Sequence, residues 1–220
     1  MLPMVMKRIG LCLILLGVAL GVAGPGGEAS AQVVIEGTVP LTGKPMSPPP
    51  SAKYKQNAGW IAPSPVQLAV VYLEGKFPGV AASSKKVSMG QKGYQFNPAV
   101  VAIQTGTSIE FPNLDNDYHN VFSYSKTKRF DLGRYRKDET PPALTFDKPG
   151  LVRLYCEIHE HMRGVILVLD TPYFTTTTAD GKFKLGGLPT GNYVLKAWLD
   201  EKTTLQQPVS LKAGTLKVSF

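Results

Sequence analysis

The sequence is short of the residues from which most catalytic and metal sites are built. It holds three histidines and two cysteines among 220 residues. Cys12 lies in an apolar stretch near the start of the chain and Cys156 stands alone after it, so an internal disulfide framework is not expected. The chain also has no glycine-rich phosphate loop, Ser-His-Asp set or paired-carboxylate signature. These absences argue against hydrolases and nucleotide-binding enzymes.

Helical patterning is also lacking. No sustained 3.6-residue periodicity runs through the chain, and no internal repeat is evident. Glycine (22) and proline (18) are frequent, and Val, Thr, Tyr and Phe are spread throughout, a mixture typical of short strands joined by turns. We therefore predict an all-β fold for a chain long enough for one or two domains.

The N-terminus has the features of a targeting segment. Lys7-Arg8 forms a positive region, residues 9–23 are apolar, and Ala29-Ser30-Ala31 is a small-residue cleavage site. We predict a signal peptide over residues 1–31, a mature chain that starts at Gln32, and a periplasmic or otherwise exported protein. The alternative is an uncleaved membrane anchor, for which the apolar run is short.

The remaining metal-binding residue types gather in two places. Cys156, His159 and Met162 follow each other at three-residue intervals, and His119 lies upstream in the run Asp117-Tyr118-His119-Asn120-Val121. Two imidazoles, one thiolate and a weak axial thioether form the ligand set of blue copper sites. We predict that these four residues bind one copper ion in a single type 1 site. A lone exported thiol is a liability unless it is buried or metallated, which favours the same interpretation.

Each of these residues also has an ordinary interpretation. Met162 alone would suit core packing, His119 a hydrogen-bonded histidine, and Cys156 an inert buried thiol. The flanking sequence favours the ligand interpretation, because residues 152–155 are typical of a strand ending at the thiol and residues 165–169 of a buried strand. A short loop between two strands would bring three ligands to one end of a sandwich.

The segment that carries these residues resembles the cupredoxins. The pattern Cys-x-x-His-x-x-Met after an upstream His-Asn-Val is similar to amicyanin and plastocyanin-like proteins, and the resemblance covers roughly residues 87–170. The whole chain resembles bacterial "methylamine utilisation protein-like" cupredoxins. The resemblance implies a Greek-key β-sandwich, the four copper ligands named above, and Asn120 as a brace for the ligand loop. Asp115 matches the family's approach to its first histidine, although turn formation is the simpler interpretation of Asp115 and Asp117.

Two further expectations concern the surface around the metal. We expect His161 to face solvent beside the copper, with a ligand exchange between His161 and Met162 as the alternative. We expect His159 to lie nearest the surface as the exit for an electron. An apolar face made of Pro112, Ile158 and Met162 would then dock a redox partner.

The charge of the chain is positive. The formal net charge is +8, and removal of Lys7, Arg8 and Glu28 with the signal segment leaves 22 basic against 15 acidic residues, or +7. Part of the excess forms a basic cluster at Lys126, Lys128, Arg129, Arg134, Arg136 and Lys137. This basic cluster favours an acidic redox partner, and a solvated surface loop is the alternative. Nucleic acid is not an expected partner of an exported chain without a binding motif, and membrane contact is expected only through an uncleaved signal segment.

The flanks of the cupredoxin-like segment have their own pattern. We divide the mature chain into an N-terminal β segment with a proline-rich loop (32–79), a cupredoxin domain (80–170) and a C-terminal β segment (171–220). Asp180-Gly181 predicts a hairpin, and Leu188-Pro189-Thr190-Gly191 a second turn. The C-terminal pattern resembles the carboxypeptidase regulatory-like β-sandwich. We predict that the two flanks pack together as a second small sandwich; the alternative is extra strands on one enlarged sandwich.

These features predict an exported carrier of single electrons that is not an enzyme. Copper binding for delivery or storage is one alternative, although storage proteins use more ligand clusters than this chain has. A copper oxidase or nitrite reductase would need further copper centres, which three histidines hardly allow. A non-catalytic β-sandwich that binds a glycan or a protein is the remaining alternative.

Overall fold

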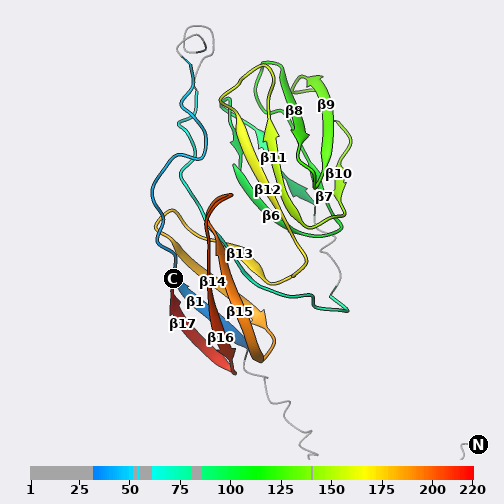
Figure 1. Ribbon diagram of the computed structural model, residues 1–220. Coiled ribbons are helices and arrows are strands. Elements are labelled where there is room, and N and C mark those ends of the chain that lie inside the picture. Colours follow the sequence, from blue (N-terminus) through cyan, green and yellow to red (C-terminus); the bar gives the residue numbers. More distant parts are fainter. Residues whose placement is uncertain (1–31, 52–53, 55–60, 81–85, 140) are drawn as a thin grey trace, which may run out of the picture. The chain divides into compact units, whose positions relative to one another are not determined.

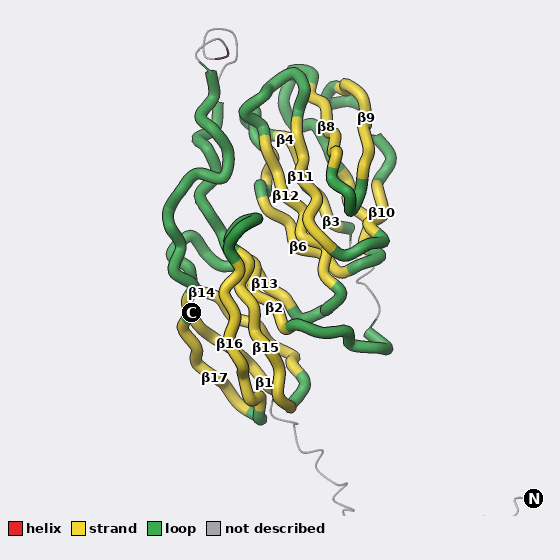
Figure 2. Tube along the Cα trace, viewed as in Figure 1, coloured by secondary structure: helices red, strands yellow, loops and turns green. Residues whose placement is uncertain are grey.

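In the part of the chain that the structure describes, the regular elements are the strands β1 to β17 (Figures 1 and 2), which confirms the all-β prediction. The computed structural model describes residues 32–51, 54, 61–80, 86–139 and 141–220. The predicted signal peptide at residues 1–31 lies outside these described residues. Among the residues described, no helix is long and apolar enough to cross a membrane.

A β-sandwich is formed by the middle of the chain. Its larger sheet has the order β6-β12-β11-β8-β9, with β12 parallel to β6 and antiparallel to β11. The strands of this sheet are β6 (Val100–Gln104), β12 (Arg163–Leu169), β11 (Gly150–Tyr155), β8 (His119–Tyr124) and β9 (Arg129–Tyr135). The smaller sheet contains β10 (Leu144–Phe146), β7 (Thr107–Glu110) and β3 (Val87–Ser88). A short pair, β4 (Gly90–Gln91) and β5 (Phe96–Asn97), completes this part.

The core of this sandwich explains why the ligand loop lies where it does. Along β11, Val152 and Leu154 point into the core and are fully buried, in the two-residue alternation of a strand. Cys156 follows with the same alternation and joins the same buried cluster. The pleat of β11 therefore carries the thiol inward at the end of the sheet. The neighbouring strand β12 is buried from Ile166 to Leu169, as its unbroken apolar run predicts.

The flanking segments form a second sandwich, which confirms that part of the predicted fold. One sheet has the order β14-β1-β17 and the other β13-β2-β15-β16. Their strands are β1 (Val33–Thr38), β14 (Lys182–Leu188), β17 (Gly214–Ser219), β2 (Val70–Leu73), β13 (Phe174–Thr176), β15 (Gly191–Trp198) and β16 (Thr204–Leu211). Ile35 and Leu195 are fully buried in the core between them. The predicted domain boundaries after residues 79 and 170 stay predictions.

The predicted hairpin at Asp180-Gly181 is wrong. A tight turn does form there, with the Gly181 N–H donating to the Thr178 carbonyl at 2.9 Å. The strands on either side nevertheless belong to different sheets, because β13 pairs with β2 whereas β14 pairs with β1. The turn thus connects the two layers of the second sandwich.

Candidate metal centre

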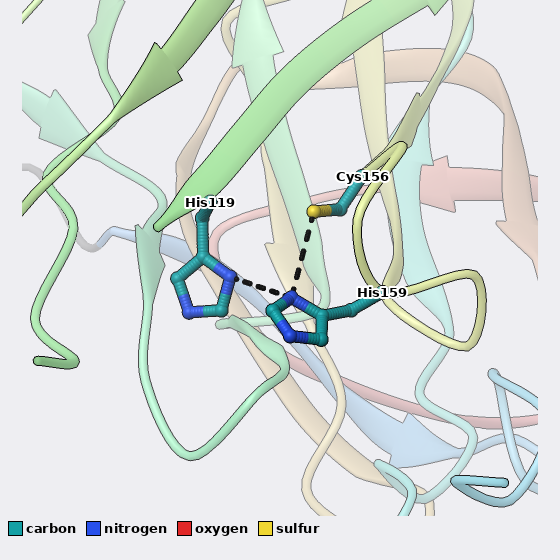
Figure 3. Close-up of side chains that lie close together, drawn as sticks. All are labelled: His119, Cys156 and His159. Carbon is teal, nitrogen blue, oxygen red and sulfur yellow. Dashed lines mark hydrogen bonds between the residues drawn. The ribbon is translucent and has the colours of Figure 1, made fainter. Parts of the chain in front are cut away.

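Three of the predicted ligands meet at one end of the larger sheet (Figure 3). His119 is the first residue of β8, Cys156 follows the last residue of β11, and His159 lies in the loop between β11 and β12. Strands β8 and β11 are neighbours, paired through Phe122 and Tyr155. Two ligands therefore come from adjacent strand ends, and the third is returned toward them by the loop.

The donor atoms of these residues point toward one another. The Nδ1 atoms of His119 and His159 are 3.1 Å apart, and the Cys156 Sγ is 3.8 Å from the His159 Nδ1. All three donors lie within 4.8 Å of each other. Tetrahedral ligands at the usual zinc distances would be separated by roughly 3.3 Å for two nitrogens and roughly 3.6 Å for nitrogen and sulfur. The donor set of this chain therefore fits a single metal ion.

The three donor residues are buried. His119 is 0% exposed, and Cys156 and His159 are each 3% exposed. His159 is thus buried, and the expectation that it is the ligand nearest the surface stays a prediction. Within the part of the chain that the structure describes, these residues form the one group of three or more His, Cys, Asp or Glu side chains placed to hold a metal.

Met162 is fully buried in the core cluster that contains Cys156. Its backbone N–H donates to the carbonyl of His159 at 2.9 Å, which closes the turn of the ligand loop. Its role as fourth ligand stays a prediction. Because Met162 is 0% exposed, it cannot belong to an apolar docking face. The prediction that Met162 forms such a face with Pro112 and Ile158 is therefore wrong for Met162.

His161 is also buried, contrary to the expectation that it faces solvent. It is 1% exposed, and both of its ring nitrogens are buried. Burial, and then repulsion from His159, lower the pKa of His161, so the neutral imidazole is favoured. It is not among the three residues whose donors converge.

Asp115 orients the first ligand. Its Oδ2 lies 2.9 Å from the Nε2 of His119, on the ring side opposite the Nδ1 that faces His159. A carboxylate on the outer nitrogen fixes the ring orientation and raises the basicity of a ligating histidine. The same carboxylate accepts the backbone N–H groups of Gly93 at 2.8 Å and Tyr94 at 3.0 Å. Asp115 thus does more than form a turn, which was the simpler interpretation of its sequence position.

Asn120 connects the strand of the first ligand to the loop of the others. Its side-chain oxygen accepts the N–H of Glu157 at 3.4 Å, while its side-chain nitrogen donates to Asp131 at 2.8 Å and to the Gly133 carbonyl at 3.0 Å. Its backbone N–H is 3.5 Å from the Cys156 sulfur. These contacts supply the bracing that was expected of Asn120.

The electrostatics of the centre favour a thiolate. Burial opposes ionisation of Cys156, but contacts with His119, His159 and the Asn120 N–H outweigh it and lower the pKa of the thiol to about 6. Burial likewise opposes protonation of His119, but Asp115 and then Cys156 raise the pKa of this imidazole. The site thus supplies an anionic sulfur at neutral pH, which is the form that binds metals.

Comparison with known proteins gives partial structural matches only. No protein-family model matches the chain, and no curated protein is significantly similar to it. A copper-containing nitrite reductase from Thermus scotoductus is 27% identical over 43% of this chain, with a TM-score of 0.37, and 24% of the reductase chain is covered. The reduced Cu(I) form of an amicyanin variant is 18% identical over 44% of this chain and 97% of its own, with a TM-score of 0.36. A purple cupredoxin from Nitrosopumilus maritimus is 20% identical over 38% of this chain and 97% of its own, with a TM-score of 0.33.

The lowered thiol pKa predicts a measurable titration. In metal-free protein, the ultraviolet thiolate absorption of Cys156 should appear with a midpoint near pH 6, about three pH units below the reference value of 9. Because the folded pKa lies below the unfolded one, this group stabilises the fold above pH 9 and loses that contribution as pH falls through 6. The difference spectrum against Cys156→Ser isolates this thiol from Cys12. A midpoint above pH 8 would contradict the interpretation.

The role of Asp115 predicts a loss of metal affinity. Asp115→Asn removes the charge that orients His119, and it should weaken binding of Co(II) by about 10–100-fold in competition with a chelator. Asp117→Asn is the matched control, because Asp117 contacts the Tyr118 N–H and the Tyr94 hydroxyl but not His119. Equal losses in the two variants would remove the special role of Asp115.

Proposed function

We propose that this chain binds one copper ion in a type 1 site and carries single electrons between redox partners. The observation that supports this most strongly is the convergence of one thiol and two imidazoles, which are buried and oriented toward each other. This is the trigonal donor set of a blue copper centre. The proposal extends to Met162 as a fourth, weak ligand.

The chain's own residues would keep the site rigid. Bound copper would supply a one-electron couple between Cu(I) and Cu(II). Asp115 holds the His119 ring, and Asn120 holds the ligand loop against β8 and β9. Because these contacts leave the donors little freedom, the ligands would move little when the oxidation state changes. A small rearrangement is what a fast electron carrier requires.

Burial favours a carrier over a delivery protein. Transfer of a copper ion to another protein needs ligands that a partner can approach, whereas His119, Cys156 and His159 are at most 3% exposed. An electron, in contrast, crosses a buried site without a ligand leaving it. A catalytic function would need room for substrate or a second centre, and the described residues offer one metal-binding group. We therefore propose a carrier that is not an enzyme.

The basic cluster is part of the proposal for a partner. Arg134 bonds to Glu157 at 2.6 Å and Lys128 lies 3.8 Å from Asp147, so part of its charge is neutralised within the chain. The remaining positive charge would attract an acidic redox partner and would mainly increase the rate at which the two proteins associate. We also propose that the protein is exported to the periplasm. The proposal includes a relationship of the middle of the chain to the cupredoxins and of its flanks to the carboxypeptidase regulatory-like β-sandwich. The sequence patterns described above support each of these points.

Addition of Cu(II) to the purified protein tests this function. We expect an intense thiolate-to-copper band in the visible spectrum at a stoichiometry of one copper per chain, because a Cys156 thiolate ligand gives such a transition. Cys156→Ser should abolish the band, while Ser123→Ala, which changes a buried residue outside the donor group, should keep it. Wild-type protein that binds copper without this band would rule out the proposed centre.

A further inference from the structure

The outer edge of His159 is covered by two tyrosines from distant parts of the chain. The Tyr54 ring lies 5.3 Å from the His159 ring at an edge-on angle of 63°, and also 5.3 Å from the His161 ring. The Tyr94 ring lies 4.9 Å from His159 at 87° and 5.5 Å from His119 at 83°. We call Tyr54 and Tyr94 the tyrosine cover.

Each tyrosine is fixed by further contacts. The Tyr54 hydroxyl donates to the Ile158 carbonyl at 3.0 Å, within the ligand loop itself. Tyr94 has a φ of 60°, the one non-glycine residue with positive φ in the described chain, and its N–H is held by Asp115. Left-handed backbone at a bulky residue persists only where surrounding contacts enforce it. The contacts of Tyr94 therefore point to a role at the metal centre.

The proline-rich segment that contains Tyr54 is attached next to Tyr94. Within this segment, which runs from Met46 to Pro65, the Ser47 hydroxyl donates to the buried Gln95 side chain at 3.2 Å, and the Ala62 N–H donates to the Gly93 carbonyl at 2.9 Å. The two ends of the segment are joined by a bond of 2.9 Å from the Met46 N–H to the Pro65 carbonyl. These attachments on both sides of residue 54 explain how a residue so distant in sequence reaches the ligand loop.

We propose that Tyr54 is a positioning residue that closes the His159 edge, so that small ligands and reagents in solution do not reach the centre. This deepens the proposed function, because a metal held there would exchange electrons only through the protein and would not bind substrate. His159 and His161 have almost no exposed surface, and the Tyr54 ring contacts both.

The closure is tested on metal-free protein with diethylpyrocarbonate, which modifies accessible imidazoles. Peptide mass spectrometry gives the modification rates of His159 and His161 separately. Tyr54→Ala should raise both rates by about tenfold, the factor that corresponds to 1.4 kcal/mol of lost closure. Tyr54→Phe keeps the ring and should stay near the wild-type rates. His119, fully buried and bonded to Asp115, is the internal reference and should stay slow.

Controls separate closure from unfolding and from the proposed function. Tyr124→Ala removes a tyrosine that is 68% exposed and should leave all three rates unchanged. If Tyr54→Ala does not fold, Tyr54→Ser and Tyr54→Leu replace it. Rates in the folded variant equal to those of wild type would overturn the closure. Because the assay needs no copper, failure to form a thiolate–copper band would overturn the proposed function without affecting this result.

In copper-loaded protein the same variants have a second readout. Azide should leave the wild-type and Tyr54→Phe spectra unchanged and should shift the spectrum of Tyr54→Ala. Water that enters the opened site favours the more highly charged Cu(II) form, so the reduction potential of Tyr54→Ala should fall. An azide response of the wild type equal to that of Tyr54→Ala would contradict closure.

Discussion

The hydrogen bond between Asp115 and His119 is the interaction on which the geometry of the centre depends. Without it, the buried His119 ring would have no fixed partner for its outer nitrogen, and its Nδ1 would not be directed at His159. Asp115 can play this part because its own backbone N–H is bonded to Asn113 at 3.0 Å. The Asn113 side chain in turn donates to the Tyr135 carbonyl at 2.9 Å, in the neighbouring strand β9. The ligand is thus oriented by a chain of bonds that ends in the sheet.

The same carboxylate links the metal centre to its cover. By accepting the N–H groups of Gly93 and Tyr94, Asp115 holds the backbone that places the Tyr94 ring against both imidazoles. Asp115 therefore both orients a ligand and helps to exclude solvent from the centre. In a site of low polarity this matters, because water would compete for the donors and would change the balance between the two charge states of a bound metal.

The sequence was informative where the structure is local, and much less so where it depends on distant contacts. Cys156 and His159 are separated by one turn at the end of a strand, so their spacing alone predicts that they meet, and the alternation along β11 predicts that the thiol points inward. His159 and His161 both contact the ring of Tyr54, whose hydroxyl donates to the ligand loop across 104 positions in sequence. No local sequence pattern predicts such a contact. Asp180-Gly181 is a similar case: the turn chemistry is local, but the pairing of β13 and β14 is decided by β2 and β1.

X-ray absorption at the copper edge, on the protein loaded with one copper and measured in both oxidation states, tests the central claim most directly. A rigid centre built from the three donor residues predicts one short copper–sulfur distance and two copper–nitrogen distances, with the same three ligands retained after reduction. A spectrum without a short sulfur distance, or one in which a nitrogen ligand is lost on reduction, would contradict a rigid centre built from His119, Cys156 and His159.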